Sequence, residues 1–247
     1  MELSPIQPLL NEPALIIKNR KILVFADLHI GIESELRGKG INPVAQTKKM
    51  IDHLFVICEE HKPHEIVLLG DIKHNIPSST ITERRDVKFF LEKIVDYGKI
   101  HLVLGNHDGN IQKLTPNEII VHPSDGFIID NTGFVHGHRW PKDEIMQCEQ
   151  IIIGHTHPTI MLTDRLNHKT FESCWLKGDF IKDRLKDKFP NAKNPKVLVI
   201  PAFNPLCGGI AINTEGINGP FGKITNVENM EVYLLDGTAM GVVKDIP

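Results

Sequence analysis

The feature that constrains the fold most is a repeated pattern in which a short apolar run ends directly in a polar group containing Asp, Asn or His. Glycine opens three of the four groups. They follow one another as Asp-Leu-His at 27–29, Gly-Asp at 70–71, Gly-Asn-His-Asp at 105–108 and Gly-His-Thr-His at 154–157. In parallel sheets the carboxyl ends of the strands meet at one edge, where ligands bind. The pattern therefore predicts an α/β fold with one site at that edge.

Between these groups, apolar spacing predicts alternating helices and strands. The runs 14–18 and 21–26 are expected to form a hairpin whose second strand is buried on both faces. Helices are expected at about 44–61 and from about residue 80 to a stop at Gly98. The first three polar groups thus end three successive strands of a parallel sheet.

After the third group the pattern changes to closely spaced short strands, which predicts a second sheet that is largely antiparallel or mixed. The charged segment 178–190 has apolar residues at helical intervals and is expected to be a surface helix. The chain closes on a hairpin with its turn at 236–237. Because 247 residues, 41% of them apolar, can bury one large core, we expect a single domain over residues 1–247.

Composition narrows the classes of function. A formal charge of −3 and a pI near 6.5 provide no basic field for non-specific binding of nucleic acid, so such a substrate would be held locally or through a partner. The four cysteines form no Cys-x-x-Cys pair and are expected to be free thiols. The chain has neither a signal-peptide pattern at its start nor a membrane-spanning apolar run, so we expect a cytoplasmic protein without membrane contact.

The polar groups contain a set of candidate metal ligands. Asp27 and His29 are two residues apart, so an extended backbone would point both to one side and turn Leu28 to the core. Asp71 has two carboxylate oxygens and is the natural ligand to share between two metals. Asn106 offers a neutral oxygen. Three histidines complete the set: His136, His155 and His157.

Such a site would attract phosphate, because two dications carry more positive charge than Asp27 and Asp71 neutralise. Divalent metals also lower the pKa of a bound water to about 7. Mixed nitrogen and oxygen ligands favour Mn²⁺ over Ca²⁺, with Fe²⁺, Zn²⁺ or Ni²⁺ as alternatives. The residues therefore indicate a phosphoester-cleaving centre with two divalent ions.

Further residues are candidates for contact with the substrate. His107 directly follows a candidate ligand and is expected to face the substrate as a catalytic group, with Asp108 fixing its tautomer and raising its basicity. His74 is expected either to bind substrate or to support Asp71. Arg37, on the loop after the first group, is expected to contact either phosphate or solvent.

Other histidines are less informative. His138 is an alternative to His136 as a ligand, although His136 is favoured because it ends an apolar run. Six more histidines fit no ligand spacing and are expected to be structural: His53, His61, His64, His101, His122 and His168.

Taken in order, the motifs resemble the signature of the calcineurin-like metallophosphoesterases, Asp-x-His, Gly-Asp, Gly-Asn-His-Asp/Glu, His and Gly-His-x-His, over residues 27–157. The resemblance implies a four-layer α/β/β/α sandwich of two mixed sheets and a catalytic role for His107. It implies one metal site made of Asp27, His29, Asp71 and His157. It implies a second made of Asp71, Asn106, His136 and His155.

Within that superfamily the chain is similar to small prokaryotic phosphoesterases related to the SbcD nuclease and to DNA-ligase-associated phosphodiesterases. The similarity rests on residues 26–31, on Gly-Asp-Ile-Lys-His at 70–74 and on Pro-Ala-Phe at 201–203. It implies a phosphodiesterase that acts on nucleotides or nucleic acid through in-line attack of a metal-bridging hydroxide.

Two alternatives remain open. The same centre could serve a phosphomonoesterase. The chain could also be an accessory or scaffold subunit of a DNA-processing complex, with a DNA-repair or replication partner. A homo-oligomer is compatible with every one of these interpretations.

Overall fold

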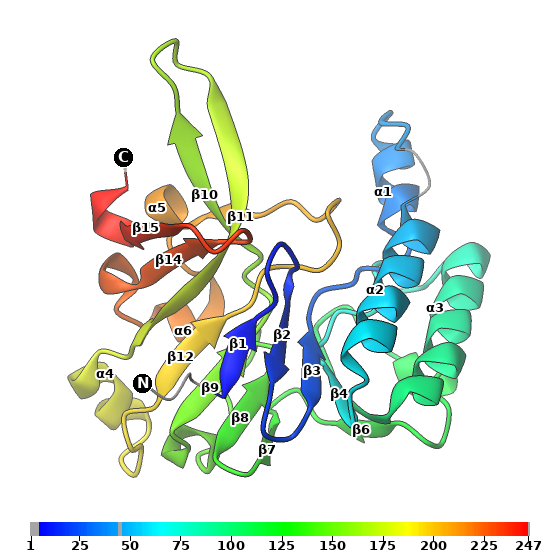
Figure 1. Ribbon diagram of the computed structural model, residues 1–247, viewed down its shortest axis with the longest axis horizontal. Helices are drawn as coiled ribbons and strands as arrows, with labels where there is room; N and C mark the ends of the chain where they lie inside the picture. Colours follow the sequence, from blue (N-terminus) through cyan, green and yellow to red (C-terminus); the bar gives the residue numbers. More distant parts are fainter. Residues whose placement is uncertain (1–4, 44–45, 247) are drawn as a thin grey trace.

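The computed structural model describes residues 5–43 and 46–246 and shows two stacked β-sheets with helices on their outer sides (Figure 1). Three groups of buried apolar residues separate the layers. One, with Leu54 and Phe90, lies between the first sheet and its helices. The second, with Val24 and Trp175, lies between the sheets, and the third, with Leu185, covers the outer face of the second sheet. The expected four-layer α/β/β/α architecture is confirmed.

The first sheet has six strands in the order β1-β2-β3-β4-β5-β6, of which β3 to β6 are parallel. Its strands are β1 (Ile6–Pro8), β2 (Ala14–Ile17), β3 (Ile22–Phe25), β4 (Glu65–Leu68), β5 (Lys99–Val103) and β6 (Ile120–His122). The predicted hairpin is the antiparallel pair β2 and β3, and every residue of β3 is buried. This sheet carries the first three polar groups to one edge.

Helices α2 (Thr47–His61) and α3 (Ile81–Ile94) cover the outer face of this sheet, and the short α1 (Ile32–Gly38) projects beyond it (Figure 1). Thr80 caps α3 in a reciprocal capping box with Glu83. Both predicted helices are confirmed, although Val44, where the first was expected to begin, lies outside the described residues. The expectation of a loop at Arg37 is wrong, because this residue is in α1.

The second sheet is mixed and has nine strands, in the order β13-β10-β11-β12-β9-β8-β7 with β14 and β15 beside β11. They are β7 (Phe127–Ile129), β8 (Thr132–Val135), β9 (Gln150–Ile153), β10 (Pro158–Thr163), β11 (Lys169–Asp179), β12 (Lys196–Val199), β13 (Ile210–Ala211), β14 (Glu231–Leu234) and β15 (Ala239–Val242). The predicted closing hairpin is β14 and β15.

Three short helices lie beside this sheet: α4 (Lys182–Lys188), α5 (Ile212–Glu215) and α6 (Gly219–Gly222). The helix predicted at 178–190 is shorter, because Lys177–Asp179 pair with β12 as the end of β11. Leu185 and Phe189 pack into the core instead of lying on the surface. Short 3-10 turns occupy Val95–Tyr97, Ile111–Lys113, Ile145–Gln147, Val227–Asn229 and Val243–Asp245.

None of the helices in residues 5–43 and 46–246 is long and apolar enough to cross a membrane.

Candidate metal centre

The predicted ligands converge at the carboxyl edge of the strands. Asp27 and His29 follow β3, Asp71 follows β4, and His136 follows β8. Ligand atoms of Asp27, His29 and Asp71 lie within 4.8 Å of one another, and so do those of Asp71, His136 and His155. Asp71 therefore belongs to two groups of potential ligands, as a shared ligand would.

The backbone at the site differs from the expected extended strand. Asp27 and His29 have φ values of 57° and 40°, so both are in the left-handed region, while Leu28 points to the core as expected. Asp71, His155 and His157 also have positive φ, between 45° and 64°. Each such residue costs about 1–3 kcal/mol, and such strain gathers at functional sites. The backbone turns at the end of each strand instead of continuing in an extended conformation, and these turns bring the side chains together.

Backbone contacts hold these turns in place. The N–H of Asp27 donates to the carbonyl of Gly70 at 3.2 Å, and the N–H of His29 donates to the carbonyl of Asp71 at 2.8 Å. Glycine is required at 105, because a Cβ there would collide with the backbone and carboxylate of Asp71. The backbone and carboxylate of Asp71 thus lie directly against Gly105.

Three buried atoms at the centre lack a hydrogen-bond partner: Asp27 Oδ1, His29 Nε2 and His157 Nε2. Asp27 Oδ1 lies 3.3 Å from His157 Nε2, and His29 Nε2 lies 3.6 Å from Asp71 Oδ2. Buried polar atoms are nearly always satisfied, so a converging group of orphans indicates a missing ligand. A carboxylate oxygen and two imidazole nitrogens are donors that fit Mn²⁺, Fe²⁺ or Zn²⁺. These residues therefore fit a divalent metal.

The other ring nitrogen of each histidine has a partner. His157 Nδ1 lies 3.2 Å from the carbonyl oxygen of Gly208, His136 Nδ1 lies 2.7 Å from that of Leu69, and His29 Nδ1 lies 3.2 Å from His74 Nδ1. A carbonyl can only accept, so Nδ1 of His157 and His136 carries the proton. Nε2 is then the nitrogen that faces the metal site, as is usual for metal-binding histidines.

The second group of ligands includes the remaining predicted residues. His136 Nε2 lies 3.3 Å from Asp71 Oδ2 and 3.3 Å from Asn106 Oδ1, and His155 completes the group. His138, the alternative ligand, lies at a steep angle to the rings of His136 and His155 but falls in none of the groups of potential metal ligands found among the described residues. The geometry therefore favours His136.

The charges at the centre are strongly coupled. Burial lowers the pKa of His136, but the carboxylates of Asp71 and Asp27 outweigh it and raise this pKa to about 9. Burial also raises the pKa of Asp71, and the charge of His136 reverses that effect, so the net shift is downward. Burial lowers the pKa of His29 to about 3 and that of His155 to about 4. The carboxylates are thus charged, and His29 and His155 are neutral and ready to bind metal.

The expected pairing of His107 with Asp108 is wrong. The buried carboxylate of Asp108 accepts four backbone N–H groups, from Asp71, Ile72, Lys73 and Gly105. His107 Nδ1 instead contacts the carbonyl oxygen of His74. The carbonyl, and not Asp108, therefore fixes the proton of His107 on Nδ1 and leaves Nε2 without it.

His74 also serves a ligand other than the expected Asp71. Its Nδ1 lies 3.2 Å from His29 Nδ1, and its Nε2 lies 2.6 Å from Glu35 Oε2. The carboxylate of Glu35 accepts a hydrogen bond from the Nε2–H group of His74. Nδ1 of His74 then has no proton and accepts a hydrogen bond from the Nδ1–H group of His29. Glu35, His74 and His29 thus form a chain that presents His29 Nε2 to the metal site. His74 also belongs, with His29 and His107, to a group of potential ligands.

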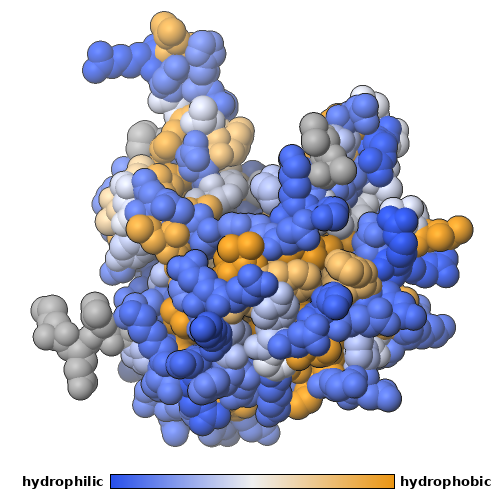
Figure 2. All heavy atoms as spheres, turned by 45° about the vertical axis from the view of Figure 1, so that its right-hand side comes forward, coloured by the Kyte–Doolittle hydropathy of each residue, from blue (hydrophilic) through white to orange (hydrophobic). Residues whose placement is uncertain are grey.

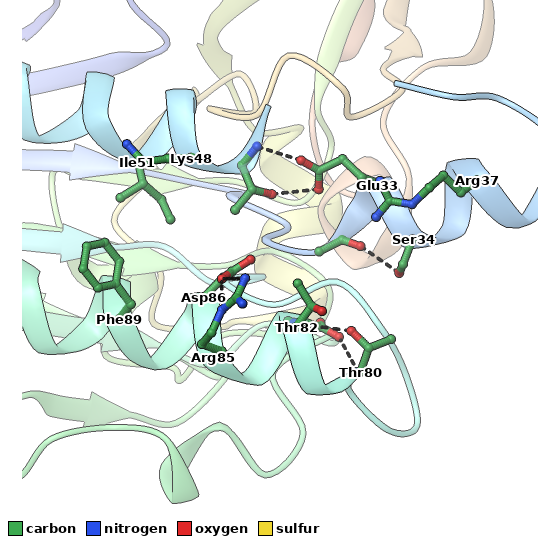
Figure 3. A pocket seen from close by; sticks show the side chains of 13 residues that line it. Glu33, Ser34, Arg37, Lys48, Ile51, Thr80, Thr82, Arg85, Asp86 and Phe89 are labelled. Carbon is green, nitrogen blue, oxygen red and sulfur yellow. Dashed lines mark hydrogen bonds and ion pairs between the residues drawn. The ribbon is translucent and has the colours of Figure 1, made fainter. Parts of the chain in front are cut away.

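Arg37 lies apart from this centre. Its side chain lines a pocket of about 440 Å³ between α1, α2 and the start of α3, with Ile51 and Phe89 among the other lining residues (Figure 3). None of the candidate metal ligands lines this pocket. The predicted contact of Arg37 with substrate phosphate therefore has no support from its position.

Two residues at the site were missed in the sequence. Glu35 has no fixed spacing to any motif, so its role depends on α1, which was not predicted. The Sγ of Cys207 groups with His29 and His157 because the loop after β12 returns across the site, where Asn204 donates to the carbonyl of Leu28 at 2.8 Å. The only sequence signal was the strand end at 201–203.

The surroundings of the centre are open. The β10–β11 hairpin and α1 project on either side, and the surface between them is hollowed (Figure 2). Beside Asn106 runs a shallow groove of about 440 Å³ that His138 and Arg139 also line. A substrate could therefore extend away from the metal ligands along the surface.

The chain is similar to proteins of known structure and matches a family model. In a solved structure, the nuclease MPE of Pseudomonas putida is similar over 94% of this chain and 97% of its own, with a TM-score of 0.60 and 20% identity. The phosphoesterase Yfce of E. coli is similar over 89% and 96%, with a TM-score of 0.41 and 11% identity. The model of the calcineurin-like phosphoesterase family matches residues 20–206. The chain therefore belongs to the calcineurin-like phosphoesterase family and is a hydrolase of phosphoesters.

Proposed function

We propose that this protein is a phosphodiesterase that uses two divalent ions, Mn²⁺ in preference, to cleave nucleotides or nucleic acid. The observation that carries the proposal is the position of Asp71, whose carboxylate belongs to one group of potential ligands with Asp27 and His29 and to another with His136 and His155. A carboxylate placed in this way can hold two ions a few ångströms apart.

In this proposal the first ion is held by Asp27, His29, Asp71 and His157. The second is held by Asp71, Asn106, His136 and His155. When bound, such ions supply a water of lowered pKa and positive charge against the phosphoryl oxygens. The chain fixes the donors in advance, because the positive-φ turns and the Nδ1 contacts orient them before metal arrives.

His107 is the proposed acid. Its ring centroid lies 4.8 Å from that of His29, so it borders the first group of ligands while remaining only half-buried. With the proton of Nδ1 held by the carbonyl of His74, Nε2 is free to hold a second proton. That proton stabilises the phosphoryl oxygens or passes to the leaving alkoxide.

We prefer a diester over a monoester as substrate. The phosphorus of a diester carries two organic substituents, and the groove beside Asn106 leaves room for the second one. The similar P. putida protein is a nuclease, which supports the same choice. The proposed unit of function is one domain over residues 1–247.

The test compares bis-p-nitrophenyl phosphate with p-nitrophenyl phosphate in Mn²⁺ buffer. Hydrolysis of the diester is expected to exceed that of the monoester, and His107→Ala and Asp71→Asn are expected to reduce it by at least a hundredfold. Activity on the monoester alone would show a phosphomonoesterase. Undiminished activity in either variant would contradict the proposed mechanism.

A further inference from the structure

A second pocket beside the metal centre is lined by three cationic side chains and by no carboxylate. It has a volume of about 300 Å³ and lies between the loop 77–79, the start of α3 and the turn after His107. Its charged lining residues are Lys73, Arg84 and Lys113. We call it the Lys73 pocket. A site of this charge selects an anion.

Lys73 is the unusual member of this set, because its residue is only 2% exposed. Its Nζ donates to the carbonyl oxygen of Asn75 at 2.8 Å, which uses one of three donors. Among residues 5–43 and 46–246, no carboxylate oxygen lies within 4.0 Å of this ammonium group. Buried charges are normally paired, since an unpaired one costs several kcal/mol. The ammonium is therefore missing a counter-charge.

The other two cations are arranged to supply more donors. Arg84 donates from Nε and Nη2 to the carbonyl oxygen of Ser79 at 3.3 and 3.1 Å, which holds its guanidinium beside the loop and leaves Nη1 free. Lys113 is exposed at the end of a 3-10 turn. Lys113 therefore adds a third positive charge at the exposed side of the pocket.

The Lys73 pocket is next to the proposed reaction site. Gly109 and Asn110 line both this pocket and the groove that runs past Asn106. Lys73 is also two residues from Asp71 along the chain, and its N–H donates to Asp108 at 3.3 Å. The Lys73 pocket and the groove beside Asn106 therefore meet at Gly109 and Asn110.

We propose that the Lys73 pocket binds a second phosphate group of the substrate, one that is not cleaved. This inference rests on the proposed phosphodiesterase function and narrows its substrate class to molecules with at least two phosphates, such as oligonucleotides or nucleotides with a terminal phosphate. Guanidinium and ammonium groups together bind phosphate strongly because their hydrogen bonds are charge-assisted.

The test uses three thymidine dinucleotides: one without a terminal phosphate, one with a 5′-phosphate and one with a 3′-phosphate. For the wild type, kcat/KM for one of the phosphorylated substrates is expected to exceed that for the unphosphorylated one by at least tenfold. Lys113→Ala and Arg84→Ala are expected to reduce this ratio to near one. Lys73→Met should do the same, with its melting temperature checked because the residue is buried.

Arg85→Ala is the matched control, because Arg85 is the next residue of α3, lines the other pocket and pairs with Asp86. It should keep the wild-type ratio. Hydrolysis of bis-p-nitrophenyl phosphate, which has one phosphate, should also be unchanged in Arg85→Ala. If the wild type fails to hydrolyse that compound, the proposed function is wrong; if it succeeds but the dinucleotide ratio is near one, this inference alone is overturned.

Free inorganic phosphate is the alternative ligand for the Lys73 pocket, because it has the same charge and acceptor oxygens as a phosphate group of the substrate. Inorganic phosphate added to protein in EDTA should raise the melting temperature of the wild type, and Lys113→Glu should lose that shift. A shift in the wild type without any preference among the dinucleotides would assign the pocket to free phosphate and overturn its role for substrate.

Discussion

The carboxylate of Asp108 accepts the backbone N–H of Asp71 at 2.8 Å, from the turn that carries the shared ligand. The same carboxylate also accepts hydrogen bonds from the N–H of Gly105 at 2.9 Å, in its own motif, and from the N–H of Ile72 at 2.9 Å, next to Asp71. Two motifs that are far apart in the sequence are thereby joined through one side chain. Asp108 is thus a support for the position of Asp71, and its motif serves two strands.

The Asp108→Asn variant is expected to lose stability and activity together. An amide has one oxygen in place of two, so its NH₂ group would face backbone N–H donors that are buried. Losing two hydrogen bonds to a charged acceptor should lower the free energy of unfolding by about 2–4 kcal/mol, measured by urea denaturation. His107→Ala, the comparison variant, should change stability by less than about 1 kcal/mol. Equal stability of the two variants would argue against this role.

Most of the fold could be predicted, because buried parallel strands and amphipathic helices leave periodic apolar patterns. The strand β3 and the helix α3 are examples. The hairpin of β10 and β11 could not, because its outer residues from Lys169 to Ser173 are exposed and leave no core-facing pattern. The short α1 was missed for a related reason, since only Ile32 and Glu33 in it are buried.

At the site, residue types and strand ends were enough to propose candidate ligands but not the residues that hold them in place. Asp27 and His29 were expected on an extended strand, and both are in left-handed turns. Local sequence does not predict such turns, because hydrogen bonds to the carbonyl oxygens of Gly70 and Asp71, about 40 residues away, hold them. The partner of His107 was also misassigned, because the nearest residue in sequence is not the nearest in space.

Glu35→Gln is expected to weaken metal binding. The carboxylate contacts His74 Nε2 at 2.6 Å, and Lys39 and His74 hold the pKa of Glu35 well below its usual range. Glutamine can donate from its NH₂ group to His74 Nε2 instead. The directions of the hydrogen bonds from residue 35 through His74 to His29 would then be reversed. Because such supports contribute 10–100-fold to metal affinity, the Kd for Mn²⁺ should rise about tenfold by calorimetry. Lys39→Met, which keeps the carboxylate of Glu35, should change the Kd for Mn²⁺ by less than about threefold. A similar loss of affinity in both variants would contradict the proposed hydrogen-bond chain from Glu35 to His29.

Metal binding is expected to release protons at pH 7.5. In the metal-free protein, the carboxylates of Asp71 and Asp27 outweigh burial and raise the pKa of His136 to about 9, so this ring is protonated at pH 7.5. A metal can bind Nε2 only after that proton leaves. Calorimetry of Mn²⁺ binding in two buffers of different ionisation enthalpy should show release of about one proton or more. In His136→Asn the number should fall by about one, and an unchanged number would contradict the assignment.

Acid should destabilise the protein through His122, the last residue of the outermost strand β6 in the first sheet. The ring stacks on Phe127 at 3.7 Å, and its Nε2 lies 2.8 Å from His101 Nδ1. Burial, and then the charge of His101, lowers the pKa of His122 from 6.5 to about 4.

Between these two pH values the unfolded chain binds the proton and the folded chain does not, so stability falls as the pH falls from 6.5 to 4. His122→Gln cannot titrate but keeps an N–H donor for His101 Nδ1, whose Nε2 donates to Glu65. From pH 7 to pH 5, the wild type should lose on the order of 1 kcal/mol more unfolding free energy than the variant. Urea denaturation in EDTA at both pH values measures this difference, and parallel losses would show that His122 does not titrate in this range.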